Sequence, residues 1–317
     1  MKNLLVIFCF TLFTVSCSNT NESENFETAN LSAKKSEGNF SQDIFPGGTR
    51  YSISKVATQG AYQQFIQNLR KNDALSIVAE VDHEKNAKSV GLQLDPTRII
   101  FFGNPELGTP LMQENQLAGL DLPQKVLFYR NEDKTDVALY NSVEYLRSRH
   151  NLSGVETLSK ISAALEKLVS KVTKREVLSA PQQSVGFEEG VITKESDKSF
   201  TQTLNDLRAA ITSNANLKLV AELDHQQNAA SVGMDLNPTS ILIFGNPNLG
   251  TPLMQEEHTI GLDLPQKMLV WENADGEVYV SYNDIYYVAE RHSVDMNDDI
   301  LEKIAAALDN LSNVATQ

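Results

Sequence analysis

The sequence predicts an α+β protein with two tandem two-layer domains, each ordered strand, helix, four strands, helix, around a mostly antiparallel sheet. Three observations predict this class. Short apolar stretches of strand length alternate with amphipathic helical stretches, the order recurs along the chain, and one block of residues returns after 142 positions, as at Ala79 and Ala221. Because each predicted strand has one strongly apolar face, one layer of helices is enough to cover the sheet.

The first copy supplies these elements in order. Apolar and β-branched runs of strand length predict its strands at residues 50–56, 75–82, 99–102, 125–129 and 137–140. A helix is expected at residues 61–72, with its aromatic and aliphatic side chains on one face. A closing helix carries Leu158, Ile161, Leu165 and Leu168 at helical spacing.

The repeat divides the chain. The returning blocks pair residues 79–83 with 221–225, 103–113 with 245–255 and 119–125 with 261–267. We therefore place the first repeat domain at residues 44–172 and the second at 186–315. Residues 173–185 between them read as a linker.

The N-terminus predicts export and lipid attachment. Lys2 precedes an apolar run at residues 4–13, which is too short to span a bilayer but suits a secretory signal. The sequence Thr-Val-Ser before Cys17 resembles a lipobox. We expect a signal peptide at residues 1–16 and a lipidated, flexible tether at residues 17–43 that anchors the protein in the cell envelope. The periplasmic face of the outer membrane is the first expectation and the cell surface the second; the alternative is an ordinary signal peptide.

Composition excludes several classes of function. The formal net charge is −14, so the chain is repelled by nucleic acid, and no nucleic-acid partner is expected. The two cysteines, Cys9 and Cys17, both precede the repeats. The repeats therefore contain no disulfide, no thiolate metal site and no catalytic cysteine.

An acid next to a histidine is the first candidate site. Asp82 and His83 follow a predicted strand, and Asp224 and His225 repeat the pair. The histidine could act as a general base or, with the aspartate, bind a metal, and Asn86 could orient a bound group. The alternative is that the aspartate caps a helix while the histidine packs locally.

A loop rich in Gly and Pro is the second candidate. Thr109 followed by Pro110 predicts an N-cap, with a short helix at residues 111–120. Such a helix start could bind an anionic ligand. The alternative is a tight turn that needs glycine for its backbone angles. The candidate residues in the two copies are Asn104, Gly108, Thr109, Asn246, Gly250 and Thr251.

Repeated charges form the remaining candidates. Arg149 and its twin Arg291 could clamp a carboxylate or phosphate, although a structural role at a helix is the alternative. His150, beside Arg149, could titrate near neutral pH. Asp121 and Lys125 could line a pocket, but a surface ion pair of little energy is the preferred interpretation.

A set of short motifs resembles one known family. The same set of motifs occurs in both copies. In the first copy the motifs are Asp82-His83, Gly91-Leu92, Phe102 to Pro105, Gly108-Thr109, Leu120 to Pro123 and Arg149. Together they resemble the domain-of-unknown-function family 302 over most of residues 44–315. The resemblance implies a compact α+β fold in single or tandem copies, and it implies no established activity.

Three functions stay open. The first is an envelope lipoprotein with two equivalent domains that bind a small ligand, for which an anion is one candidate, or a protein partner. The second is a hydrolase or lyase acting on a small anionic substrate, which requires Asp82, His83 and Arg149 to meet in one cleft. The third is a metal-binding protein that uses the twinned histidines. The sequence assigns no cofactor and no catalytic residue.

Overall fold

The computed structural model describes residues 45–295 and 299–317. The predicted signal peptide, the tether and Cys17 lie outside the described residues. Residues 45–317 form one compact unit. Along the described part of the chain, none of the helices combines the length and apolar character needed to cross a bilayer.

The first repeat contains a six-stranded antiparallel sheet in the order β2-β3-β4-β5-β1-β6. Its strands are β1 (Thr49–Ile53), β2 (Ser76–Asp82), β3 (Thr97–Gly103), β4 (Gln124–Arg130), β5 (Asp136–Asn141) and β6 (Leu178–Ser179). Its helices are α2 (Thr58–Arg70), α3 (His83–Ser89), α4 (Pro105–Glu114), the 3-10 helix η2 (Gln116–Asp121), α5 (Val143–His150) and α6 (Thr157–Thr173).

The second repeat contains a five-stranded antiparallel sheet in the order β7-β11-β10-β9-β8. Its strands are β7 (Val191–Ser196), β8 (Lys218–Asp224), β9 (Thr239–Gly245), β10 (Gln266–Glu272) and β11 (Val278–Asn283). Its helices are α7 (Phe200–Ser213), α8 (His225–Ser231), α9 (Pro247–Glu256), η3 (His258–Leu262), α10 (Ile285–Arg291) and α11 (Asp299–Thr316). The predicted α+β class, the antiparallel sheet and the order of the long elements are confirmed in both repeats.

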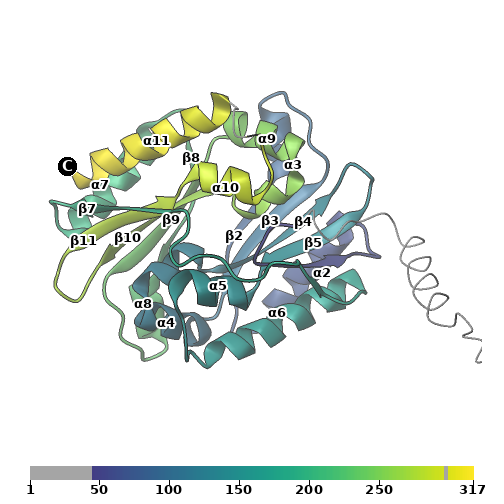
Figure 1. Ribbon diagram of the computed structural model, residues 1–317, viewed down its shortest axis with the longest axis horizontal. Helices are drawn as coiled ribbons and strands as arrows, with labels where there is room; N and C mark the ends of the chain where they lie inside the picture. Colours follow the sequence, from purple (N-terminus) through teal and green to yellow (C-terminus); the bar gives the residue numbers. More distant parts are fainter. Residues whose placement is uncertain (1–44, 296–298) are drawn as a thin grey trace, which may run out of the picture. The chain divides into compact units, whose positions relative to one another are not determined.

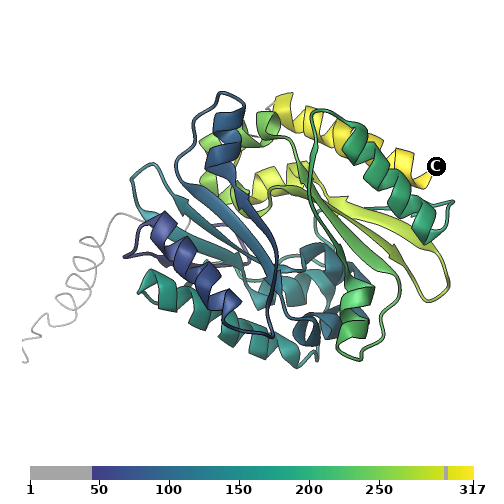
Figure 2. The ribbon, with the colours of Figure 1, turned by 180° about the vertical axis from the view of Figure 1, so that it is seen from behind.

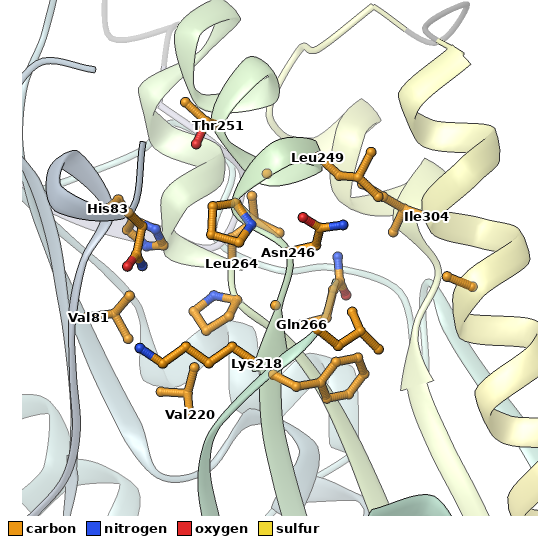
Figure 3. A pocket seen from close by; sticks show the side chains of 18 of the residues that line it. Val81, His83, Lys218, Val220, Asn246, Leu249, Thr251, Leu264, Gln266 and Ile304 are labelled. Carbon is orange, nitrogen blue, oxygen red and sulfur yellow. The ribbon is translucent and has the colours of Figure 1, made fainter. Parts of the chain in front are cut away.

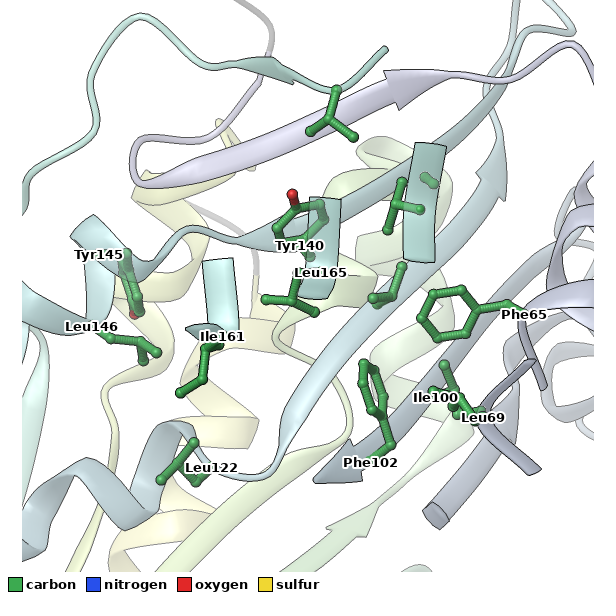
Figure 4. Close-up of a cluster of buried hydrophobic side chains, with 14 of the residues drawn as sticks. Phe65, Leu69, Ile100, Phe102, Leu122, Tyr140, Tyr145, Leu146, Ile161 and Leu165 are labelled. Atoms are coloured by element: carbon green, nitrogen blue, oxygen red, sulfur yellow. The ribbon is translucent and has the colours of Figure 1, made fainter. Parts of the chain in front are cut away.

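Two long helices cover the outer face of each sheet. Figures 1 and 2 show α2 and α6 on the first sheet and α7 and α11 on the second. In the first repeat, Phe65 and Leu69 of α2 meet Phe102 of β3 and Leu165 of α6 in a buried cluster (Figure 4). Burial of each such side chain contributes about 1.5–3 kcal/mol, which explains why the apolar faces predicted from helical spacing turn inward.

The inner faces of the two sheets are also buried, contrary to the one-sided burial expected from the sequence. Most residues of β3, β4, β9 and β10 are buried, whichever face of the sheet their side chains occupy. Each repeat covers the other: Leu117 and Leu120 of η2 pack against Ile241 and Leu269 of the second sheet. Gly119 permits this approach, because a Cβ there would lie 3.0 Å from Leu269 Cδ1.

The helix predicted to have Thr109 as its N-cap begins five residues earlier than expected, so that prediction is wrong. Asn104 is the N-cap of α4, and its side chain accepts a hydrogen bond from the backbone N–H of Glu106 at 2.9 Å. Pro105 occupies the first helical position, where a missing N–H costs nothing. Thr109 therefore lies inside the helix, and neither Gly103 nor Gly108 has the positive φ that a tight turn would need.

Candidate functional site

Two cavities lie at corresponding places in the two repeats. The first pocket, of about 270 Å³, lies between the ends of β2 and β3, α4 and α6. The second pocket, of about 90 Å³, lies between the equivalent ends of β8 and β9, α9 and α11. Their lining residues match almost position for position. The fold therefore builds one kind of pocket twice.

Each pocket is completed by the other repeat. His83 and Asn86 belong to α3 of the first repeat but line the second pocket. His225 and Asn228 of α8 line the first pocket in the same way. Figure 3 shows His83 on one side of the second pocket and Ile304 of α11 on the other. Neither repeat alone can form a complete pocket.

The aspartate before each histidine fixes where the imidazole lies. Asp82 is the N-cap of α3: it accepts a hydrogen bond from Lys85 N at 2.9 Å and pairs with Arg98 at 2.8 Å. Asp224 caps α8 by accepting from Gln227 N at 2.8 Å. The carboxylate of each aspartate is used to cap the helix. Asp82 therefore does not line the pocket that contains His83, and Asp224 does not line the pocket that contains His225, so neither forms an acid–base pair with its histidine there.

Three buried polar atoms in each pocket have no hydrogen-bond partner in the described part of the chain. In the second pocket they are His83 Nε2, Thr251 Oγ1 and Gln266 Nε2. In the first pocket they are His225 Nε2, Thr109 Oγ1 and Gln124 Nε2. A buried polar group without a partner costs about 1–3 kcal/mol, so native proteins contain few of them. The same three positions are unpaired in both repeats, which marks a place for a polar ligand group.

The pocket histidines are neutral at pH 7. Desolvation by burial lowers the pKa of His83 to about 4, and the nearby Asp82 and a backbone hydrogen bond with Leu264 oppose this only partly. Desolvation also lowers the pKa of His225 to about 4, against a backbone hydrogen bond with Gly119. Since Nε2 is unpaired in both rings, the backbone bond uses Nδ1. A neutral ring that donates from Nδ1 to a carbonyl presents Nε2 as an acceptor.

The rest of each wall is apolar. In the second pocket it is formed by Phe244, Leu249, Leu264, Ile304, Leu308 and Leu311. The corresponding side chains of the first pocket are Phe102, Leu107, Leu122, Ile161, Leu165 and Leu168. Two positions differ in charge: the exposed Lys218 lines the second pocket where Ser76 lines the first, and Glu222 lines the first pocket whereas no acid lines the second. Such a lining suits a small molecule that is mostly apolar and carries few polar groups.

The predicted anion site at the helix start is not formed as expected. Asn104 and Asn246 line the two pockets, but their side-chain oxygens already cap α4 and α9. The backbone N–H of Gly108 donates to Asn104 O at 2.9 Å. Gly108, Thr109 and their twins Gly250 and Thr251 nevertheless line the pockets, as helix residues rather than as turn residues.

A second twinned cluster lies buried between the repeats. This central ion cluster consists of Asp121, Lys125, Arg149, His150, Asp263, Lys267, Arg291 and His292. No side chain in it is more than 4% exposed. The surface ion pair expected for Asp121 and Lys125 is therefore wrong, because each of these residues pairs with a residue of the other repeat and is covered by it.

The two arginines are fully engaged in this cluster. Arg149 donates to Asp121 Oδ2 at 2.8 Å and to Asn283 Oδ1 of the second repeat at 2.9 Å. Arg291 donates to Asp263 Oδ2 at 2.6 Å and to Asn141 Oδ1 at 2.8 Å. The backbone carbonyls of Glu189 and Gly47 accept from Nε and Nη2 of Arg149 and Arg291, respectively. Neither arginine lines a pocket, so the cleft that the enzyme hypothesis required of Asp82, His83 and Arg149 is not formed.

The other twinned pair of histidines supports the ion cluster. His150 Nε2 lies 2.9 Å from Asp121 Oδ2, and His292 Nε2 lies 2.9 Å from Asp263 Oδ2. Within residues 45–295 and 299–317, no three His, Cys, Asp or Glu side chains gather where they could hold a metal ion. The metal-binding hypothesis therefore receives no support from the arrangement of the twinned histidines.

Comparison with known proteins identifies the repeats. Residues 52–170 and 192–311 match the family described as "Domain of unknown function DUF302". The chain belongs to the DUF302 family. A DUF302 crystal structure from Bacillus stearothermophilus, titled an uncharacterized conserved protein, is 17% identical, with a TM-score of 0.35, and the match covers 40% of this chain and 98% of that one.

Two curated proteins of Brucella share one segment with this DUF302 chain. It is 38% identical over 123 residues to "Fluoride-specific ion channel FluC 1" of Brucella suis biovar 1 (strain 1330) and to "Fluoride-specific ion channel FluC 2" of Brucella melitensis biotype 1. The shared segment covers 39% of this chain, 48% of the first protein and 45% of the second. The chain thus spans about half the length of the curated relatives it matches.

Sequence reasoning missed one polar position of the DUF302 pockets. Gln124 and Gln266 belong to the block of seven residues that is identical in the two copies, at 119–125 and 261–267. That identity was the available signal. A glutamine at the start of a strand matches no known binding motif. Its position in a pocket could therefore not be predicted from the residue type.

Proposed function

We propose that this DUF302 chain is a non-enzymatic binding protein of the bacterial envelope, with two pockets of matching chemistry that each take one small molecule. One observation carries the proposal. A histidine, a threonine and a glutamine each present an unpaired buried polar atom to an apolar cavity, and the same three positions do so in both repeats. Pockets of this kind are the common form of small-molecule sites.

The arrangement of charges supports binding rather than catalysis. Each pocket has one neutral histidine. No acid lines the second pocket, and Glu222, the acid that lines the first, is paired with Arg208 at 2.7 Å. The strongly perturbed carboxylates, Asp121 and Asp263, belong to the central ion cluster and line neither pocket. The groups that could move a proton are therefore separated from the cavities that could hold a substrate.

Native mass spectrometry with a library of small aromatic and aliphatic fragments tests the proposal. The wild-type chain should retain two fragment molecules. Gly108→Leu places an isobutyl group in the first pocket and Gly250→Leu does so in the second; a Cβ at either position meets only one leucine side chain, at 3.7 or 3.6 Å. Each single variant should retain one molecule and the double variant none.

Ala209→Leu is the matched control, because it also creates a leucine, one carbon short of the same addition, at an exposed site on α7 that lines neither pocket. It should retain two molecules. A double Gly→Leu variant that folds and still retains two fragments would place binding elsewhere and reject the proposal.

The envelope location is a separate part of the proposal and rests on the sequence before the repeats. We expect Cys17 to carry lipid and to hold the protein at the periplasmic face of the outer membrane. Labelling of cells with an alkyne analogue of palmitate should mark the wild-type chain and not Cys17→Ala. The variant should also leave the membrane fraction. Resistance of the wild-type chain to protease added to intact cells would distinguish the periplasmic face from the cell surface.

A further inference from the structure

We propose that both pockets select a neutral amphiphile, with an apolar body about the size of one six-membered ring and one hydroxyl-type group that both donates and accepts hydrogen bonds. This inference rests on the proposed function and specifies its ligand. It is carried by the pairing of donors and acceptors, by the charges of the pocket walls and by the cavity volumes.

The polar atoms of each pocket require a ligand group of mixed character. In the second pocket, His83 Nε2 is an acceptor, Gln266 Nε2 is a donor, and the Thr251 hydroxyl can act as either. A hydroxyl group can donate to the histidine and accept from the amide at once. A carboxylate or a ketone can only accept, and an ammonium group can only donate, so each would leave one wall atom unpaired.

Figure 3 shows how these groups are arranged around the second pocket. His83 and Thr251 lie on the side of the second pocket opposite Ile304, and Gln266 lies between them and the apolar wall. A ligand can therefore direct its polar group toward the histidine while its apolar body lies against α11. The same polar and apolar positions recur in the first pocket, so the same orientation is expected there.

The charges of the walls disfavour an ionised ligand. In the first pocket the ionisable lining residues are His225, which is neutral, and Glu222, which already pairs with Arg208 at 2.7 Å. In the second pocket the cation is Lys218, which is exposed, so solvent weakens its attraction for an anion. A carboxylate in the first pocket would lose its hydration without gaining a partner. The pocket chemistry thus favours a neutral ligand over the small anionic one expected from the sequence.

The cavity volumes set the size. An engineered apolar cavity of about 150 Å³ binds benzene. The first pocket, of about 270 Å³, can hold a substituted ring, whereas the second, of about 90 Å³, is smaller than that reference cavity and has to widen to admit a ring. Lys218 stands where the first pocket has Ser76, which accounts for part of this difference. We therefore expect the first pocket to bind a ring compound more tightly than the second.

The test compares three probes with one ring: phenol, benzene and benzoate, each titrated into the full wild-type chain and followed by isothermal calorimetry and protein NMR. Phenol should bind at residues of both pockets. Benzene should bind about tenfold more weakly, since one hydrogen bond is worth about a factor of ten, and benzoate more weakly still. Benzene binding as tightly as phenol, or benzoate binding most tightly, would overturn the ligand class while leaving the pockets as binding sites.

Failure of all three probes separates the two proposals. If the fragment library still yields a ligand of another class that both Gly→Leu changes displace, the neutral amphiphile is wrong and the binding function stands. If the library also yields nothing, both proposals fail.

Thr109→Val and Thr251→Val supply the residue-level test. Valine keeps the shape and the β-branch of threonine and removes only the unpaired hydroxyl, so the free protein should unfold at the same or a higher temperature. Phenol affinity should fall about threefold to tenfold at the altered pocket, and benzene affinity should not change. Unchanged phenol affinity in both variants would overturn the role of the hydroxyls in selection.

Discussion

Lys125 of the first repeat and Asp263 of the second form an ion pair of 2.6 Å in which both side chains are only 2% exposed. Asp263 also accepts from Arg291 and lies against His292, while Arg149 and Arg291 each reach an asparagine of the opposite repeat. The charges of each repeat are therefore neutralised by the other. This ion pairing between the repeats explains why they form one compact unit and why a histidine of each repeat lines the pocket of the other.

Asp263→Asn should destabilise the protein strongly. The change removes the negative charge that Lys125, Arg291 and His292 share, and it leaves cations buried without a counter-charge. Breaking a buried pair in this way costs about 3–5 kcal/mol. Asp95→Asn is the matched control: Asp95 pairs with Lys134 at 2.9 Å on the surface, where a pair is worth less than about 1 kcal/mol. Urea unfolding measures both. Equal small losses would show that the central ion cluster does not stabilise the fold.

Lys267→Met should change how stability depends on alkaline pH. Burial and the neighbouring Lys125 lower the pKa of Lys267 to about 7, although Asp121 and Asp263 oppose the shift. The unfolded lysine titrates near pH 10.5. Between these values the unfolded chain binds more protons than the folded one, so the free energy of unfolding rises with pH. The wild-type protein should become more stable from about pH 7 to 10, and Lys267→Met should lose this rise. The same slope in both proteins would contradict the assignment.

The central ion cluster also shows the limit of sequence reasoning. The strands, the helices and the repeat follow from local periodicity, and His83 and His225 could be selected because both copies keep them. Lys125 and Asp263, however, are 138 residues apart, and their pairing depends on how one repeat packs on the other. No local pattern encodes that packing. Within one copy, Asp121 and Lys125 resemble an exposed pair, and only the second repeat buries them.

The position of Thr109 gives a second example. Thr-Pro is a strong helix-start signal, but Asn104-Pro105 is another one five residues earlier, and the structure uses it. The earlier start lets α4 turn the Thr109 hydroxyl to the first pocket. Competing local signals of similar strength are decided by tertiary packing, which one copy of the sequence does not reveal.

The protein should lose stability as pH falls from about 6.5 to 4. Burial lowers the pKa of His83, His225 and His292 to about 4, whereas unfolded histidines titrate near 6.5. In this window the unfolded chain takes up protons that the folded chain does not, so the free energy of unfolding falls by several kcal/mol. The pKa values of Asp121 and Asp263 are well below 3.8, so these carboxylates add to the loss only at lower pH.

His83→Leu with His225→Leu separates the pocket histidines from the rest. Both changes remove a buried group that has an unpaired nitrogen, and the double variant should lose the slope that these two residues cause. The remainder should come from His292 and from His258, because burial lowers the pKa of each. Urea unfolding between pH 4 and 7 measures the slopes, and an unchanged slope in the double variant would show that the two pocket histidines are charged in the folded protein.

Exchange of Ser76 and Lys218 should exchange the sizes of the pockets. Lys218→Ser removes the long side chain beside the second pocket, and Ser76→Lys adds one beside the first. Both positions are exposed, so stability should change by less than about 0.5 kcal/mol. Phenol affinity should rise at the second pocket of Lys218→Ser and fall at the first pocket of Ser76→Lys. If phenol affinity at each altered pocket equals that of the same pocket in the wild type, these two side chains do not contact the ligand.

Gly108→Ala should stabilise the fold and weaken the first pocket. Gly108 lies inside α4 with an ordinary helical backbone, and an added Cβ would meet only Leu122 Cδ1, at 3.7 Å. Alanine is favoured over glycine in a helix by about 0.8–1 kcal/mol, so folding should gain close to that amount. Since Gly108 and Leu122 both line the first pocket, the new methyl group narrows it, and phenol affinity there should fall while the second pocket is unaffected. Thermal unfolding without ligand and a phenol titration followed by NMR measure the two effects. A gain in stability with no loss of affinity would mean that the glycine is not kept to leave room in the pocket.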